Sequence, residues 1–467
     1  MKPFLFLSLI GLYLIATLFR LQGLVPVISL LSLLAVILSI PGSSRLVQAL
    51  TGLFLLTGSL MLWSGHIDWY SYVTAYGGML NLLSLFALIP LLALPIPLGG
   101  YNTAIEQVLQ RRVNTPQQLY RTVSGLAFFL SSFLNLATLP LMYYSVQGAV
   151  TRFGIRNSKR FTSLGMIHGY ALPILWTPVA PIVGVVMDLT KANWLRMFPL
   201  LFGLSVVSLL LDWLLQQVAG HQVAKKRLPL ETKAEISLRE LAATADSATC
   251  SGSHSPSKQK LTELAGAVIL FLMLVVVLEH WLPFGLVTTV TILSLPFAFA
   301  WAMLLGQAKS FWREVHNHVT VQIPKMGEQF AIFLSAGFFV KALQLSGYSE
   351  TINGAVLQIE RAIGVGAFLA CLPLLPLVLA YLGMHPVVAI TLLAQSLDPA
   401  SLSVSANALT LALLGGAVTT FIMGPFNATL GIMSSLIKEN PFRISLWSWP
   451  FTVCFLLLLL LTVVLLF

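Results

Sequence analysis

Residues 161–190 have the sequence FTSLGMIHGYALPILWTPVAPIVGVVMDLT, which is apolar enough for a lipid bilayer yet contains three prolines. A proline inside a helix removes a backbone hydrogen bond and clashes with the preceding turn, at a cost of about 3 kcal/mol. Hydrocarbon has no water to satisfy the freed carbonyl groups. A membrane helix interrupted here is therefore expected to be buried in protein or to line a wet cavity.

The composition of the whole chain indicates a membrane protein. Of the 467 residues, 57% are hydrophobic and 9% are charged, whereas soluble domains have about 25% charged residues. Apolar runs of about 20 residues, the length that crosses a bilayer, recur along nearly the whole chain. The excess of 26 basic over 16 acidic residues lies mainly in short loops, which is typical of cytoplasmic loops and argues against nucleic acid as a partner. We expect an all-α integral membrane protein.

The basic residues also predict the topology. Lys2 and Arg45 place the N-terminus and the loop after the second helix in the cytoplasm, whereas the loop at 65–69 has no lysine or arginine and suits the outside. Residues 122–148 have basic clusters at both ends, so we expect a re-entrant hairpin there. Continued along the chain, the rule gives about 11 transmembrane helices and a second, opposed hairpin at about 363–395. The expected location is the cell membrane of a bacterium (the inner membrane), with the lipid bilayer as a partner.

The sequence divides into two membrane halves. These are residues 1–217, with an extra first helix and a broken helix at 161–190, and residues 262–467, with a broken helix at 404–437; a hydrophilic cytoplasmic linker at 218–261 joins them. Shifted by 247 positions, PVAPIVGVVMDLTKANWLR at 178–196 aligns with PFNATLGIMSSLIKENPFR at 425–443, with six of nineteen positions identical. In the expected topology the copies run in opposite directions. Inverted repeats with helices interrupted at corresponding places are typical of secondary transporters, whose site lies at mid-membrane.

The interruptions themselves correspond. Thr177-Pro178-Val179-Ala180-Pro181 aligns with Gly424-Pro425-Phe426-Asn427-Ala428. Opened helices present free N–H and C=O groups: the positive N-terminal ends suit an anion, and the carbonyls suit Na⁺ or a group that carries a proton. The alternative is that the prolines only kink packed helices.

The order of a surface helix at 100–121, a hairpin, a proline-broken helix and a further helix, given twice across residues 70–467, resembles the ion transporter superfamily. Within it, the chain resembles the divalent anion:sodium symporter family, which has a Ser-Asn-Thr motif at each hairpin tip and a Thr-Pro-Pro-Asn-like break after it. Asn135-Leu136-Ala137-Thr138 is similar to the first tip; Thr177-Pro178 and Gly424-Pro425-Phe426-Asn427 are similar to the breaks. The second tip, Leu382-Gly383-Met384-His385-Pro386, departs from the motif, which leaves dicarboxylate and sodium open. The resemblance implies an elevator-type architecture, a Na⁺ site near Asn135 and Asn427, and a homodimer.

We expect the residues at the tips and breaks to bind the substrate or the coupling ion. His385 can hydrogen-bond an anion or carry a proton, and the alternative for such groups is ordinary hydrogen bonding between helices. His168, one turn before Pro173, is interpreted as a packing histidine. The nine expected site residues are Asn135, Thr138, Thr177, Pro178, His385, Gly424, Pro425, Asn427 and Thr429.

Together these features predict a secondary active transporter of a small organic, carboxylate-like anion, coupled to Na⁺ or H⁺, and not an enzyme. No cofactor or resident metal is expected. One alternative is a translocase of a lipid or a polyprenyl-phosphate, which the apolar segment LPLLPLVLAYLG at 372–383 favours. The other is a membrane-embedded enzyme acting on lipid-linked substrates. Such an enzyme needs paired carboxylates or clustered ligands, and the expected spans have none.

Overall fold

The structure is a computed structural model, and it describes residues 2–101, 104–105, 113–155, 157–219, 257–282, 284–397 and 404–466. Most of the expected linker at 218–261, and residues 102–103 and 106–112 of the expected surface helix at 100–121, lie outside the described residues. Every regular element in the described ranges is a helix, as the composition predicts.

Nine helices in the described part of the chain are long and apolar enough to cross a membrane, or up to 11 if each of two bent pairs is one span. One pair, Tyr348–Ile363 with Val365–Tyr381, is bent by 113°, and the other, Pro441–Trp447 with Trp449–Leu465, by 55°. The prediction of a multi-pass helical membrane protein is confirmed, with nine to 11 candidate spans among the described residues.

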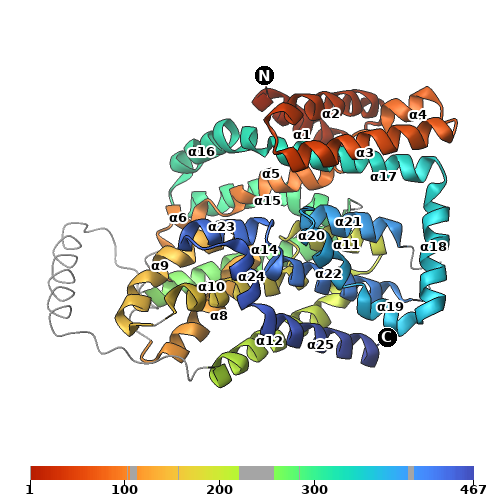
Figure 1. Cartoon of the computed structure of the whole chain (residues 1–467). Coiled ribbons are helices and arrows are strands. Elements are labelled where there is room, and N and C mark those ends of the chain that lie inside the picture. The colour runs from red at the N-terminus through yellow and green to blue at the C-terminus, as the bar shows by residue number, and fades with distance from the viewer. Residues whose placement is uncertain are drawn as a thin grey trace.

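The first layer of the molecule is built from the N-terminal helices, which pack on one helix of the second half (Figure 1). The Ser29 hydroxyl donates to the carbonyl oxygens of Val73 at 2.6 Å and Tyr76 at 2.8 Å, and this ties α2 to α4 and to the residues that follow α4. The rings of Phe6 and Phe330 stack at 3.9 Å and join α1 to the C-terminal half. The elements are α1 (Lys2–Leu18), α2 (Val25–Ser39), α3 (Arg45–Ser64), α4 (Trp69–Thr74) and α17 (Gly327–Leu345).

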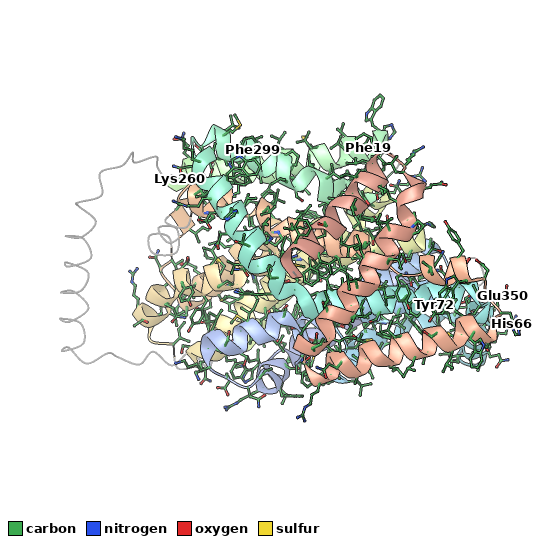
Figure 2. The ribbon with its side chains drawn as sticks, turned by 90° about the horizontal axis from the view of Figure 1, so that it is seen from above. Phe19, His66, Tyr72, Lys260, Phe299 and Glu350 are labelled. Carbon is green, nitrogen blue, oxygen red and sulfur yellow. The ribbon has the colours of Figure 1, made fainter. Side chains whose placement is uncertain are left out.

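A second layer lies below the first and is formed by α5, which packs along α15. Lys260, near the start of α14, donates to the carbonyl oxygen of Gly99 at 3.0 Å. Seen from above, Lys260 and Phe299 lie at the opposite end of the molecule from His66 and Glu350 (Figure 2). The elements are α5 (Leu80–Leu92), α6 (Pro95–Leu98), α14 (Ser257–Trp281) and α15 (Leu286–Leu304). α16 (Ala308–Asn317) follows α15 and lies at the level of the first layer (Figure 1).

The remaining helices of the first half surround the interrupted segment. α8 and α9 pack on each other and both pack on α10. The α8–α10 contact is close because Gly169 has no side chain: a Cβ there would meet the carbonyl oxygen of Ser124 and the Cβ of Ala127. The elements are α8 (Pro116–Leu134), α9 (Thr138–Phe153), α10 (Ser158–Ala171), α11 (Pro181–Thr190) and α12 (Trp194–Ala219).

The second half repeats this order at the expected spacing. α18 runs down one side of the molecule from α17 to α19. Adding 247 to the first and last residue numbers of α11 gives the bounds of α23. Adding 247 to those of α12 gives the first residue of α24 and the last residue of α25. The elements are α18 (Tyr348–Ile363), α19 (Val365–Cys371), α20 (Leu374–Tyr381), α21 (Pro386–Ser396), α22 (Ala406–Met423), α23 (Ala428–Ile437), α24 (Pro441–Trp447) and α25 (Trp449–Leu466).

Candidate functional site

A cavity of about 440 Å³ lies where the two interruptions and the two turns meet. The first half contributes the turn at 134–137 and residues 180–182 beside the first interruption. The second half contributes residues 385–387 and Ala428. Segments that lie far apart in the sequence therefore enclose one space, between α5 and the start of α17.

The first turn is held in an unusual backbone conformation. Asn135, at the end of α8, has φ 51° and ψ −134°, and it begins a single 3₁₀ turn, Asn135–Ala137. Its Oδ1 accepts a hydrogen bond from the Tyr170 hydroxyl at 3.0 Å, which fixes the turn to α10, and both side chains line the cavity. Thr138, which starts α9, has a buried hydroxyl with no hydrogen-bond partner among the described residues, and it does not line the cavity.

The first interruption is held by two hydrogen bonds between side chains and backbone carbonyl groups. After α10 the chain forms a 3₁₀ turn, Leu172–Leu175, and it becomes helical again only at Pro181. The Thr177 hydroxyl donates to the Ser132 carbonyl oxygen at 2.6 Å, and the Trp194 indole donates to the Trp176 carbonyl oxygen at 2.9 Å. Thr177 and Pro178 are buried and lie outside the cavity wall.

At the second interruption, one amide bridges the gap between helices. The Asn427 Oδ1 accepts from the Leu430 N–H at 2.8 Å and caps α23. Its Nδ2 donates to the carbonyl oxygens of Thr420 at 2.7 Å and Phe421 at 3.2 Å at the end of α22. All the polar atoms of this side chain are thus engaged by the backbone.

The neighbours of Asn427 at this interruption are buried too. Gly424, Pro425 and Thr429 have little solvent exposure, and they do not line the cavity. Their binding role stays a prediction.

The second turn places His385 in the cavity wall. Its Nδ1 accepts from the Val387 N–H at 3.3 Å, so the ring caps α21. A neutral ring that accepts at Nδ1 carries its proton on Nε2. His385 therefore has one N–H donor left for a ligand.

Several polar cavity residues were not expected from the sequence to be part of the site, and two of them, Lys325 and Gln329, lie around the start of α17. Lys325, in the turn Ile323–Met326 before α17, lines the cavity, and none of the ion pairs among the described residues involves it. Gln329, four positions later, also lines the cavity, and its Oε1 is buried without a partner in the described structure. Positions four apart share one helix face, and that spacing is the only sequence signal for this pair.

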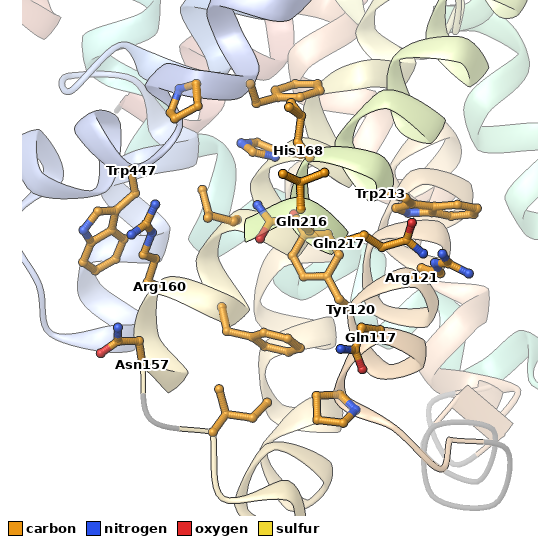
Figure 3. A pocket seen from close by; sticks show the side chains of 18 residues that line it. Gln117, Tyr120, Arg121, Asn157, Arg160, His168, Trp213, Gln216, Gln217 and Trp447 are labelled. Atoms are coloured by element: carbon orange, nitrogen blue, oxygen red, sulfur yellow. The ribbon is translucent and has the colours of Figure 1, made fainter. Parts of the chain in front are cut away.

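A second cavity, of about 360 Å³, lies between the start of α8, α10, the end of α12 and α25 (Figure 3). His168 lines it, and its Nδ1 lies 2.7 Å from the Asp212 Oδ1, with both side chains buried. The Tyr120 hydroxyl lies 3.1 Å and 2.9 Å from the two Asp212 carboxylate oxygens. His168 is thus one member of a buried polar cluster with Asp212 and Tyr120. The sequence had suggested only a histidine that packs between helices.

The described residues contain no group of three or more histidine, cysteine, aspartate or glutamate side chains placed to hold a metal ion.

Fold and cavity together define a class: a multi-pass helical membrane protein in which two interrupted helices and two turns meet at a central cavity. The chain is similar to the crystal structure of the YdaH transporter of Alcanivorax borkumensis, with a TM-score of 0.55 and 14% sequence identity over 89% of this chain and 97% of that chain. At this identity the likeness shows a shared fold. No protein-family model matches the sequence, and no curated protein does.

Proposed function

We propose that the protein is a secondary active transporter of a small organic, carboxylate-like anion, working by alternating access around the 440 Å³ cavity. The observation that carries the proposal is the set of helix ends at this cavity. α11, α21 and α23 all begin in its wall, at Pro181, Pro386 and Ala428. The N-terminus of a helix carries about half a positive charge, so three of them favour an anion.

The side chains in the wall have the same preference. Lys325 is a full positive charge, and His385 has an N–H donor. None of the described lining residues is acidic. The Tyr170 hydroxyl donates to Asn135, and His318 is bonded to the Ala87 carbonyl oxygen. The amides of Asn135, Gln322 and Gln329 are further polar groups in the wall that can orient a carboxylate.

The mechanism that we infer moves the hairpin-bearing helices against a scaffold that includes α2, α3, α14 and α15, in a homodimer built from inverted repeats. Coupling is to Na⁺, near Asn135 and Asn427, or to H⁺. A transporter with the same fold supports transport as the general activity. The chemistry of the cavity supports the anion.

Uptake by the full chain in liposomes tests the proposal. The probes are labelled succinate, citrate and benzoate, each offered under an inward Na⁺ gradient and under an inward H⁺ gradient. We expect gradient-dependent uptake of at least one of them, and a loss of about tenfold or more in Lys325→Gln because a charged hydrogen bond is removed. Lys309→Gln is the matched control, because Lys309 is exposed on α16 and lies outside the cavity wall.

The alternatives give different results in the same preparation. Flipping of a labelled lipid or polyprenyl-phosphate without anion uptake would replace the proposal with a lipid translocase. Conversion of a lipid-linked substrate in detergent, with no gradient, would replace it with an enzyme. Equal uptake by Lys325→Gln and the wild type would dismiss the anion site.

A further inference from the structure

The second cavity contains a group that the proposed anion site does not use. Asp212 is fully buried on α12, and it is bonded to His168 of α10 and to Tyr120 of α8. A carboxylate at this depth is costly unless it is paired. These three side chains, which we call the His168 cluster, join three helices around one ionisable pair.

The hydrogen bonds fix where a proton can bind. Tyr120 donates to Asp212, and the 2.7 Å contact places the His168 Nδ1 proton against the same carboxylate. The other ring nitrogen, Nε2, is buried and has no hydrogen-bond partner among the described residues. A neutral ring with its hydrogen on Nδ1 has a lone pair on Nε2, so Nε2 is an unused acceptor on a ring that lines the cavity.

The charge balance of the cluster favours protonation of His168 Nε2. With Asp212 ionised and His168 neutral, the His168 cluster has a net charge of −1 inside the protein. One proton on Nε2 converts it to an imidazolium–carboxylate pair with no net charge, which removes the uncompensated buried charge. No other bond has to form or break, and Tyr120 keeps donating in both states.

The surroundings of His168 contain few other ionisable groups. Arg121 of α8 and Arg160 of α10 line the cavity and oppose a further positive charge. Figure 3 shows both of them apart from His168, and the Arg121 guanidinium lies 5.9 Å from the centre of the Trp213 ring. On the side of α25, the Phe451 ring stacks on His168 at 4.3 Å.

The other elements packed on α10 add little charge to this site. The 3₁₀ turn Leu172–Leu175, α22 and α23 contain no ionisable residue. The ionisable residues of α9, α24 and α25 are outside the cavity wall; they are Tyr143, Tyr144, Arg152, Arg443 and Cys454.

We propose that the His168 cluster is a proton-binding site with the buried His168 Nε2 as the proton acceptor, beside the 360 Å³ cavity that the residue lines. Its place along the chain connects it to the anion site: the His168 carbonyl oxygen accepts the Leu172 N–H, and Leu172 opens the interruption that leads to Pro181. This inference rests on the proposed transport function. It makes H⁺ the coupling ion, and it places the proton at a site separate from the anion site.

Histidine NMR tests proton binding without a substrate. The full chain is labelled with ¹⁵N-histidine in nanodiscs and titrated from about pH 5 to about pH 9. The His168 signal is assigned by its absence in His168→Gln, and we expect its Nε2 to change from unprotonated to protonated within this range. Asp212→Asn should weaken proton binding at His168 by about tenfold or more, because the carboxylate partner is lost. His280→Gln is the control, because His280 is exposed at the end of α14.

The outcomes separate the two proposals. A His168 signal that does not change over the range, or that titrates identically in Asp212→Asn, overturns the proton site, and anion uptake under a Na⁺ gradient would be unaffected by that result. Tyr120→Phe removes one hydroxyl and keeps the ring, so it remains informative if Asp212→Asn fails to fold. We expect tighter proton binding in this variant, because Asp212 loses a donor that stabilises its charge. Unchanged binding in Tyr120→Phe contradicts the cluster.

Discussion

Lys191 and Lys438, which lie 247 positions apart, end α11 and α23 in the same way. Each is the C-cap of its helix in the left-handed conformation, with φ 61° and φ 51°. Gly100 and Gly347 have the same spacing and the same kind of backbone, with φ 67° and φ 77°. Left-handed backbone is rare outside glycine, so its recurrence at one spacing extends the sequence repeat to local geometry. The helices after the two interruptions can therefore be treated as counterparts.

Asn427 is predicted to be a structural bridge. Asn427→Ala removes the cap of α23 and both bonds to the end of α22, and we expect it to destabilise the protein by about 2 kcal/mol. Asn427→Ser keeps a capping oxygen and should lose about half as much. Thermal unfolding of the purified variants in one detergent gives the comparison. If Asn427→Ala unfolds like the wild type but loses anion binding, Asn427 is a binding residue instead.

The sequence predicted the helical class, the repeat spacing and the positions of both interruptions, because proline and charge patterns act locally. It could not show which polar groups face the cavity. Asn135 and His385 do, whereas Thr138 and Thr429 do not, and this depends on the rotation of each helix. Lys325 lies in the turn before α17, away from the tips and interruptions, and for that reason it was not expected at the site.

The pairing of His168 with Asp212 was not predicted either, because it also depends on how helices pack. Asp212 lies 44 positions further along the chain, and only the packing of α10 on α12 brings the two together. No local pattern in either helix marks such a pair. A buried acidic residue in an apolar run is the one signal available, and by itself it does not identify a partner.

Close packing of α8 on α10 depends on Gly169. In Gly169→Ala the new Cβ meets the carbonyl oxygen of Ser124, which belongs to the backbone and cannot move aside easily. We expect a loss of stability of about 1–3 kcal/mol, typical of overpacking. Gly148→Ala on α9 is the matched control, because nothing lies within 4 Å of its added Cβ, and alanine there should be neutral or stabilising by up to about 1 kcal/mol. Equal unfolding midpoints for both variants would contradict the close contact.

His385 has two roles that substitution can separate. Asparagine is a good N-cap, so His385→Asn should retain the cap on α21, with a change in stability within about 0.5 kcal/mol, while removing the ring donor. His385→Ala loses both. We expect anion-induced thermal stabilisation to fall in both variants, and the ligand-free unfolding temperature to fall only in His385→Ala. A ligand-free loss in both would mean that the ring is needed for packing against Phe333, whose ring centre is 5.5 Å away.

Glu439, in the loop between α23 and α24, makes stability depend on pH. Partial desolvation alone would raise the pKa of its carboxyl. The N–H of Asn440, the hydrogen bond and charge of Arg443 and the charge of Lys159 outweigh this, and they lower the pKa below its ordinary value of 4.5. The Arg443 Nη1 lies 3.3 Å and the Lys159 Nζ 3.6 Å from the carboxylate oxygens.

A carboxyl with a lowered pKa stabilises the fold at pH values above its unfolded pKa, and this contribution is lost as the pH falls through the folded pKa. The wild type should therefore unfold at a higher temperature than Glu439→Gln at neutral pH, and the difference should shrink to zero between about pH 5 and about pH 3. It should also shrink in 1 M salt, because exposed ion pairs are screened. Glu350→Gln, an exposed carboxyl on α18, is the control and should show no such convergence. Wild-type and Glu439→Gln curves that stay parallel down to pH 3 would show that these ion pairs do not connect Lys159, at the start of α10, to the loop after α23.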